Sequence, residues 1–292
     1  MNISPAARRG ALRLLPLLLA ACGSPAPEPD EAPAAQAAPE VAFARLSADP
    51  VAHGERLATV LGCNGCHGKD LTGEDWSDPE WGRLWTANLT RAVPRYTDDS
   101  ALERAIRGGI GHGGRELWEM PSHLFTHLSD SEMKALIAWL RTHRPAGEDH
   151  PPPTFGPRGK REIAAGTWRS SAADIQKEGN RWPPDAGSAH ALGRYIVRAT
   201  CSECHGLGLE GDKDQEQDRP APPLAVAAAY DREQFRTLLR TGKPIGGREL
   251  RLMSGAARWR YSRLTEAELD AVYEYLKAVS DGAARKQASP SG

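Results

Sequence analysis

The feature that most restricts the fold of this chain is a pentapeptide, Cys-x-x-Cys-His, that occurs twice in 292 residues. The first copy holds Cys63, Cys66 and His67, and the second holds Cys201, Cys204 and His205. We name residues 63–67 clamp 1 and residues 201–205 clamp 2. Two thiols and an imidazole within five residues are typical of a metal site, a redox-active dithiol or a haem-attachment site.

Three interpretations of the clamps differ in what they require of the rest of the chain. A zinc site needs four ligands, and the adjacent Cys66 and His67 cannot easily face one tetrahedral ion together. A redox-active dithiol of the thioredoxin kind is expected beside a βαβ pattern, which this sequence lacks. Haem attachment needs two thiols for the vinyl groups and a neighbouring histidine as proximal iron ligand. The pattern therefore predicts two covalent haem c groups, with His67 and His205 as axial ligands.

An internal repeat points to the sixth iron ligand of each haem. The segments RGGIGHGGRELWEMP from Arg107 and RTGKPIGGRELRLMS from Arg240 share Gly-Gly-Arg-Glu-Leu followed by a methionine, so Met120 corresponds to Met253. The remaining methionine after the N-terminal region, Met133, aligns with a leucine and is expected to be packing. We predict Met120 and Met253 as iron ligands; the alternative is that they only fill the haem crevice. A bis-histidine first haem remains an alternative, because three histidines without counterparts in the second repeat lie near Met120: His112, His123 and His127.

The N-terminus predicts export. Three arginines precede an apolar run at residues 14–21 that is too short to span a bilayer, so residues 1–21 are expected to be a signal peptide. The sequence LAAC ending at Cys22 resembles the lipobox of bacterial lipoproteins, which implies lipidation of Cys22. Residues 22–48 are then a lipid anchor with a flexible Pro/Ala-rich tether. The alternative is an ordinary signal peptide with an incidental Cys22. The expected location is the periplasm, anchored to a membrane, with Gly23 favouring the outer one.

Short amphipathic helices are expected around each clamp. Leu57, Val60 and Leu61 precede clamp 1 at helical spacing, and two further stretches, at residues 102–106 and 235–239, end at glycines. Capping boxes at Ser129–Glu132 and Thr265–Glu268 each open a helix with apolar residues on one face. Such small units bury little apolar surface, so the haem is expected to supply much of each core.

Each half of the chain resembles a class I cytochrome c, and the whole is similar to bacterial dihaem cytochromes c and to the cytochrome subunits of membrane-bound alcohol and gluconate dehydrogenases. The resemblance implies a mainly α fold of two tandem domains, each wrapped around one covalent haem. We name residues 49–145 half 1 and residues 189–285 half 2; residues 146–188 form the expected linker and residues 286–292 a tail. The aromatic pair Trp168 and Trp182 indicates that the linker packs against a domain.

The same resemblance implies three structural details. A Pro-x-Leu loop offers a carbonyl to the proximal histidine, and Pro222 fits this role in half 2. In half 1 the equivalent position is Ala87, so the proline is missing and the loop is expected to be less rigid. Trp139 and Tyr275 are expected to pack near the first helix of their halves.

The predicted function is single-electron transfer between redox proteins. Histidine and methionine together fill both axial positions and leave no open site, so no small-molecule substrate is expected. The rival interpretation is a dihaem peroxidase or another haem enzyme with an exchangeable sixth ligand at haem 1. The 37 basic and 38 acidic side chains give a net charge of -1, and nothing in this balance indicates a nucleic-acid partner.

Charge is uneven along the chain. Residues 248–263 contain five arginines and one acid, whereas Glu74, Asp75, Asp78 and Glu80 follow clamp 1. One hypothesis is that half 2 docks an acidic protein partner, which predicts salt-dependent electron transfer. The alternative is that one or two arginines pair with haem propionates and that the other charges are simply solvated. The five arginines are Arg248, Arg251, Arg258, Arg260 and Arg263.

Overall fold

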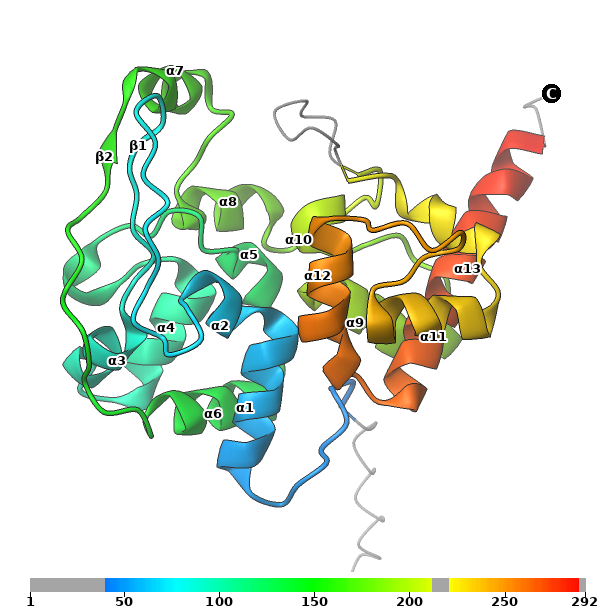
Figure 1. The fold of residues 1–292 in the computed structure, drawn as a ribbon, viewed down its shortest axis with the longest axis horizontal. Helices are drawn as coiled ribbons and strands as arrows, with labels where there is room; N and C mark the ends of the chain where they lie inside the picture. The colour runs from blue at the N-terminus through cyan, green and yellow to red at the C-terminus, as the bar shows by residue number, and fades with distance from the viewer. Residues whose placement is uncertain (1–39, 212–220, 289–292) are drawn as a thin grey trace, which may run out of the picture. The chain divides into compact units, whose positions relative to one another are not determined.

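The helices of this protein begin and end where capping residues place them. The computed structural model describes residues 40–211 and 221–288, so Cys22 and the expected signal peptide lie outside it. Asp98 caps α4 (Asp99–Gly108), which ends at Gly109 with a left-handed backbone; α11 (Arg232–Thr241) ends in the same way at Gly242. The described chain is mainly helical, which confirms the expected fold class (Figure 1).

The elements of the two halves follow one another in a similar order. Half 1 contains α1 (Pro50–Leu61), α2 (Cys63–Cys66), β1 (Gly82–Arg83), α3 (Leu89–Ala92), η1 (Val93–Arg95), α4, η2 (His112–Gly114), α5 (Ser122–Phe125) and α6 (Asp130–Leu140). Half 2 contains η3 (Ser188–His190), α9 (Ala191–Ala199), α10 (Ser202–His205), η4 (Leu224–Ala229), α11, α12 (Leu252–Trp259), η5 (Tyr261–Arg263) and α13 (Glu266–Ala288).

The first and last helices of each half cross at a glycine. In half 1 a Cβ at Gly54 would lie 2.0 Å from the carbonyl oxygen of Ala135 and 2.8 Å from Cβ of Trp139. In half 2 a Cβ at Gly193 would lie 2.0 Å from a helix carbonyl and 2.6 Å from Cβ of Tyr275. Only glycine permits such close approach of two helix backbones. The expected packing of Trp139 and Tyr275 near the first helices is confirmed.

Both predicted capping boxes form. The Ser129 hydroxyl accepts from the Glu132 backbone N–H, and the Glu132 carboxylate accepts from that of Ser129. Thr265 and Glu268 repeat the arrangement, with N···O distances of 2.7 and 3.1 Å. Behind these caps Met133 and its counterpart Leu269 are fully buried, as expected of packing residues. Each box therefore fixes the start of the helix that crosses the clamp-bearing segment.

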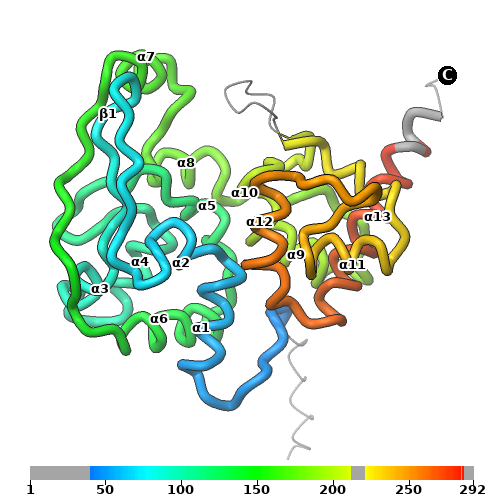
Figure 2. Tube along the Cα trace, in the orientation of Figure 1, coloured from blue at the N-terminus to red at the C-terminus, as the bar shows by residue number. Residues whose placement is uncertain are grey.

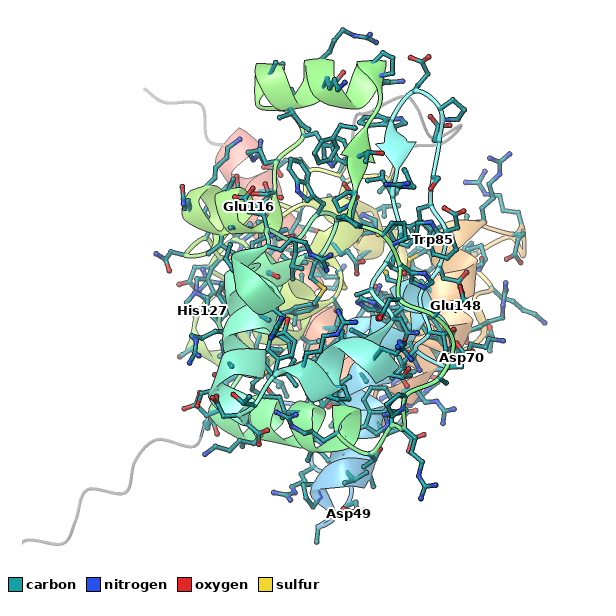
Figure 3. All side chains as sticks on the ribbon, turned by 90° about the vertical axis from the view of Figure 1, so that its left-hand side faces the viewer. Asp49, Asp70, Trp85, Glu116, His127 and Glu148 are labelled. Atoms are coloured by element: carbon teal, nitrogen blue, oxygen red, sulfur yellow. The ribbon has the colours of Figure 1, made fainter. Side chains whose placement is uncertain are left out.

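The linker is a folded cover rather than a free spacer. It contributes β2 (Thr154–Phe155), α7 (Pro157–Ala165) and α8 (Ser171–Glu178), and β2 pairs antiparallel with β1 through Gly82↔Phe155 and Arg83↔Thr154. Figure 3 shows α7 and the β1–β2 pair standing at one end of half 1, above Trp85. The Trp168 ring contacts Trp81, and the Trp182 ring contacts His127 at 5.0 Å between centroids. These contacts confirm that the linker packs against a domain.

Two contacts join the halves in a reciprocal way. Tyr195 on α9 of half 2 donates its hydroxyl to Glu132, the capping glutamate of half 1. Arg56 on α1 of half 1 pairs with Glu268, the capping glutamate of half 2. Both carboxylates are almost completely buried, and buried charges require such partners. Each half thus binds the last helix of the other through its own first helix.

The segment before α1 is fixed at this junction. The backbone N–H of Phe43 donates to Glu132 at 2.6 Å, and that of Ala44 donates to Glu268 at 2.8 Å. Figure 2 shows this segment next to the end of α12. The Phe43 side chain is buried against Tyr195, with ring centroids 5.8 Å apart. The expectation of a flexible tether over residues 22–48 is therefore wrong for its described part, which packs because Phe43 is an apolar anchor within it.

Among the helices of residues 40–211 and 221–288, none has the length and apolar character needed to cross a membrane.

Candidate functional site

Each clamp is a single helical turn. Helix α2 begins at Cys63 and ends at Cys66. Helix α10 begins directly after Cys201 and contains Cys204. Residues three apart on a helix share one face, so the two sulfur atoms of a clamp point to the same side. All four cysteines are free thiols, and burial raises the pKa of each, to about 12 for Cys63 and about 11 for Cys204. The thiols are therefore protonated at neutral pH.

The histidine of each clamp is held by a backbone carbonyl. His67 Nδ1 lies 2.8 Å from the Ala87 oxygen, and His205 Nδ1 lies 2.7 Å from the Pro222 oxygen. The carbonyl contacts implied by the resemblance are confirmed, and the contact in half 1 forms without the proline. Burial lowers the pKa of both imidazoles, against the opposing effect of these hydrogen bonds. A neutral imidazole whose Nδ1–H is bound to a carbonyl presents Nε2 as a metal ligand.

The backbone after each clamp follows the same path. The Gly73 N–H donates to the His67 oxygen at 2.8 Å, and the Gly211 N–H donates to the His205 oxygen at 3.0 Å. Inside each of these loops a leucine adopts positive φ: Leu71, at 62°, in half 1 and its counterpart Leu209, at 64°, in half 2. Positive φ is uncommon for a residue with a branched side chain and persists only where the surroundings enforce it. The two halves thus share one rigid loop geometry that places the carbonyl against the histidine.

The two predicted methionine ligands occupy different local structures. Met120 lies in a loop just before α5, whereas Met253 lies in the first turn of α12 rather than in the expected loop. Both are partly buried and packed against the hydrophobic core. Positive φ occurs near each one but at different positions of the repeat: Glu119, with φ 62°, directly precedes Met120, and Arg251, with φ 50°, lies two residues before Met253. In the described ranges, the four non-glycine residues with positive φ lie either in the loops that follow the clamps or within two residues before Met120 and Met253.

These groups fit a haem c better than the rival occupants. Within the described residues no cluster of three or more His, Cys, Asp or Glu could hold a bare metal ion, so a zinc site has no support. A reactive dithiol needs a lowered thiol pKa, whereas burial raises the pKa of all four clamp thiols. Two neighbouring thiols, a carbonyl-bound imidazole and a thioether packed on the core are the protein groups that a covalent haem requires.

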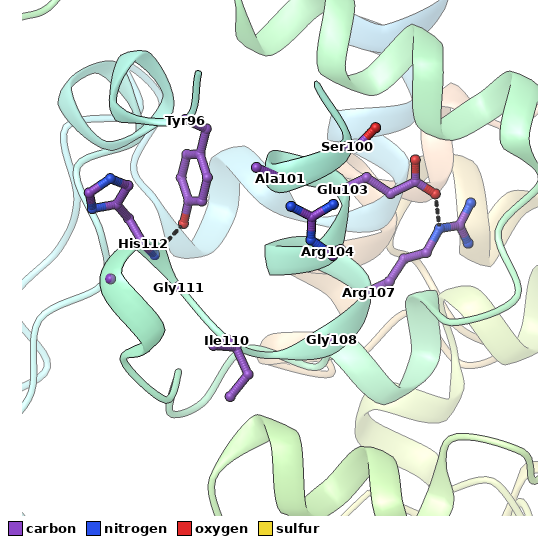
Figure 4. Close-up of a pocket in the computed structure, with 11 residues that line it drawn as sticks. Tyr96, Ser100, Ala101, Glu103, Arg104, Arg107, Gly108, Ile110, Gly111 and His112 are labelled. Atoms are coloured by element: carbon purple, nitrogen blue, oxygen red, sulfur yellow. Dashed lines mark hydrogen bonds and ion pairs between the residues drawn. The ribbon is translucent and has the colours of Figure 1, made fainter. Parts of the chain in front are cut away.

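The three rival histidines of half 1 contact residues outside clamp 1, although Nδ1 of His123 and Nε2 of His127 are buried without a hydrogen-bond partner among the described residues. His112 lines an open cavity of about 680 Å³ beside α4, and its backbone N–H donates to the Tyr96 hydroxyl at 2.8 Å (Figure 4). No clamp residue lines that cavity. His127 packs on Trp182, and His123 lies on the side of half 1 that faces the charged residues of α8. The contacts of these histidines with other described residues therefore lead away from clamp 1.

The charged clusters are partly internal to the fold. Arg260 is one of the five arginines that were expected to dock a partner, to pair with haem propionates or to be solvated. Its side chain is instead buried and pairs with Glu203 of clamp 2 at 2.7 Å. Arg258 pairs with Glu249 at 2.8 Å on the surface. No local pattern in the sequence distinguishes Arg260 from its exposed neighbours, because its partner lies 57 residues earlier in the chain.

An aromatic cluster that no sequence pattern predicted covers the ligand loop of half 1. Trp118, two residues before Met120, packs on Phe155 and Trp168 of the linker, with ring centroids 4.6 and 5.1 Å apart. Trp168 also donates its indole N–H to Glu119. The abundance of tryptophan, with eight in the chain, was a signal that could have indicated it.

Comparison with known proteins agrees with this geometry. The sequence profile of the family described as Cytochrome c matches residues 51–144 and 190–280, which is more than half of the chain. The chain is 25% identical over 260 residues to the fructose dehydrogenase cytochrome subunit of Gluconobacter japonicus, covering 78% of this chain and 52% of that protein. It is 29% identical over 171 residues to a subunit of the nicotinate dehydrogenase of Pseudomonas putida, covering 54% of this chain and 14% of that protein.

A shorter similarity, 29% over 92 residues, links it to the CcoP subunit of the cbb3-type cytochrome c oxidase of Helicobacter pylori, covering 32% of this chain and 27% of that protein. The chain thus spans about half of the fructose dehydrogenase subunit and smaller parts of the other two relatives.

Proposed function

Because this chain belongs to the cytochrome c family, we propose that it carries single electrons between redox proteins through two covalently bound haem c groups, one in each half. One observation carries the proposal: the same assembly occurs twice. In each half two cysteines lie in or directly beside a helical turn with a histidine whose Nδ1 is bound to a carbonyl, which leaves Nε2 for iron.

The ligands follow from that assembly. Covalent attachment is assigned to the four clamp cysteines, proximal ligation to His67 and His205, and distal ligation to Met120 and Met253. Support for the methionines comes from their match in the repeat and their packing on the core. A filled sixth position would leave no site for peroxide or another small substrate.

The haem supplies the one-electron chemistry, and the chain supplies attachment, orientation and burial. The carbonyls of Ala87 and Pro222 fix the ring orientation of the two histidines and strengthen them as ligands. Apolar residues of α1 and α6, or of α9 and α13, keep water away from one side of each site. The loops after the clamps, with positive φ at Leu71 and Leu209, place these carbonyls against the histidines.

The partners are proposed to be redox proteins of a dehydrogenase or oxidase system, as the names of the relatives suggest for those proteins. Half 2 offers a docking surface beside Met253, where the apolar Ile245 and Leu252 are exposed in the same segment as several exposed arginines. An apolar centre with cationic neighbours suits a protein partner with an acidic rim. Higher ionic strength is then expected to slow electron transfer to such a partner.

Anchoring is the remaining part of the proposal. The arginines and short apolar run of residues 1–21, with Cys22 in a lipobox-like sequence, support export to the periplasm and a lipid anchor, with the outer membrane favoured. Labelling with a radioactive fatty acid should mark the wild-type chain and not a Cys22→Ala variant. Labelling of both would exclude Cys22 as the anchor.

The central experiment counts haems and identifies their ligands in the mature protein. Mass spectrometry should find two haems per chain, and the far-red band that Met–Fe(III) ligation gives in this family should fall to about half in Met120→Ala and in Met253→Ala. Met133→Leu is the matched control and should retain the full band. Rapid turnover of peroxide by the wild-type protein would overturn the carrier role in favour of a haem enzyme with an open first site.

A further inference from the structure

Arg260 lies between the two clamps. It follows the last residue of α12 in half 2, and its side chain is buried although it carries a full charge. Its Nε donates to the Val60 oxygen at 3.1 Å, and its Nη2 donates to the Leu61 oxygen at 3.0 Å. These are the final carbonyls of α1, the helix that leads into clamp 1. A cation at a helix C-terminus is favourable there because the carbonyls lack partners within the helix.

The third donor of Arg260 reaches the other clamp. Its Nη1 lies 2.7 Å from Oε2 of Glu203, which stands between Cys201 and Cys204. The side-chain exposure of the pair is 9% for Arg260 and 24% for Glu203, so water screens the interaction only in part. One guanidinium therefore joins the helix before clamp 1 to the interior of clamp 2.

The preceding residue adds a packing contact at the equivalent point of clamp 1. A Cβ on Gly65 would lie 2.3 Å from Cζ3 of the Trp259 ring, so the indole lies directly against the clamp backbone. Gly65 and Glu203 occupy the same position in their pentapeptides. The Trp259–Arg260 pair thus touches both clamps at matching sites, one by packing and one by charge.

Both charges of this pair therefore lie in the clamp region. The Arg260 guanidinium spans from the Leu61 oxygen, two residues before Cys63, to clamp 2, and the Glu203 carboxylate belongs to clamp 2 itself.

We propose that Arg260 and Glu203 form a positioning pair that locks the two clamps together and sets the reduction potentials of both haems by opposing charges. The proposal rests on the proposed function, since it needs a haem in each clamp. A nearby cation stabilises the reduced haem, which has one positive charge fewer, and so raises the potential; a nearby carboxylate lowers it. A unit charge ~10 Å from a redox centre, at an effective dielectric constant of ~20, shifts a one-electron equilibrium by roughly tenfold, or ~59 mV.

The test is a pair of charge-removing variants of the full-length, haem-loaded protein, measured by spectroelectrochemical titration. Arg260→Gln should lower both midpoint potentials by the equivalent of roughly tenfold, because it leaves Glu203 without its cation. Glu203→Gln should raise them, and the double variant should return close to the wild type. Purely structural damage would not produce opposite signs. Arg258→Gln, on the exposed turn before it and paired with Glu249, is the matched control and should leave both potentials unchanged.

Flash reduction of one haem provides a second readout, the rate of electron redistribution between the halves. Arg260→Gln should slow this rate, and Arg258→Gln should not. Potentials that stay within twofold of the wild-type equilibrium in both charge variants would overturn the pair as a determinant of potential. Failure of the proposed function is separately visible, because the wild-type chain would then contain fewer than two haems.

Discussion

The two halves carry the same clamp, the same histidine–carbonyl contact and the same helix crossing, yet their ligand loops are covered differently. Around Met120 the linker closes an aromatic cluster built on Trp118. Around Met253 the loop is open, with Ile245 49% and Leu252 66% exposed. The shared parts hold the cofactor, and the parts that differ decide how far solvent and partners approach it. The docking surface proposed for half 2 thus lies on the more exposed of the two segments.

A single position of the repeat accounts for much of this difference. Trp118 of half 1 corresponds to Arg251 of half 2. The indole provides a large flat surface on which Phe155 and Trp168 pack, whereas the exposed Arg251 has no aromatic surface to offer. The linker is therefore recruited to half 1 by side-chain chemistry and not only by its place in the chain.

The largest expected effect comes from removing one clamp at a time. Replacing both cysteines of clamp 1, or both of clamp 2, with alanine should leave one haem per chain, measured by mass. Without its haem each half loses much of its core, but half 1 keeps the aromatic cluster. Hydrogen exchange should therefore show greater loss of protection in half 2 without its haem than in half 1 without its haem. Equal losses would contradict the view that the linker supports half 1 independently.

At the helix crossings, where the two halves are alike, the same substitution should lower the free energy of unfolding by the same amount in each half. Gly54→Ala and Gly193→Ala each force a Cβ to 2.0 Å from a helix carbonyl, which should destabilise the affected half by about 3 kcal/mol in thermal or denaturant unfolding. Gly108→Ala and Gly255→Ala are the controls, because a Cβ there meets nothing within 4 Å. A tolerated alanine at only one of the two crossings would show that the halves differ in their cores as well.

Removal of Trp168 should affect half 1 alone. Trp168→Ala deletes the ring shared by Trp81, Trp118 and Phe155, and should destabilise half 1 by ~2 kcal/mol, since the ring is half-buried. External imidazole should then replace the Met120 ligand faster, while the Met253 site is unchanged. The control is Trp76→Ala, a tryptophan with 41% exposure. Equal acceleration at both haems would show that the cluster does not shield half 1 selectively.

The smallest expected difference between the halves is in mild acid, which should destabilise half 1 more than half 2. Burial lowers the pKa of His53, His123 and His127 below the usual 6.5, so the folded half 1 holds them neutral. The unfolded chain takes up protons near pH 6.5, so their contribution to stability is present above that pH and is lost as pH falls below it. Half 2 has only His190 outside its clamp.

Calorimetry between pH 7 and pH 5 should therefore show the transition of half 1 moving to lower temperature more than that of half 2. Replacing His123 and His127 with glutamine should reduce this difference, and replacing the exposed His112 in the same way should not. A pH dependence that is the same in all three proteins would assign the acid sensitivity to other groups.

Much of the fold could be predicted because its signals are local. The capping boxes at Ser129 and Thr265 and the glycine stops at Gly109 and Gly242 lie beside the helices that they delimit. Each clamp can be recognised because its three functional residues lie within five positions of the sequence. Met120 and Met253 can be recognised as candidates because they occupy the same position in the two copies of the repeat. The histidine–carbonyl contact was expected from resemblance and formed even with Ala87, because the backbone path rather than proline places the carbonyl.

The rest depends on pairs of residues that are distant in the chain. In the sequence Arg260 cannot be distinguished from the four other arginines of its segment. Only the fold shows that it contacts Glu203 and the end of α1. The sequence pattern places Tyr195 on the apolar face of a helix and does not indicate that its hydroxyl donates a hydrogen bond to Glu132. Such partners have no spacing rule, since burial and complementarity select them only after the helices have packed.

The fixed N-terminal segment has a consequence for the order in which this protein matures. Residues 43 and 44 leave the ribosome early, yet the Ala44 N–H finds its acceptor, Glu268, only 224 residues later. The hydrogen bond between Ala44 and Glu268 can form only after the final helix has been synthesised. A chain that stops short of Glu268 therefore lacks the contact that ties this early segment to half 2.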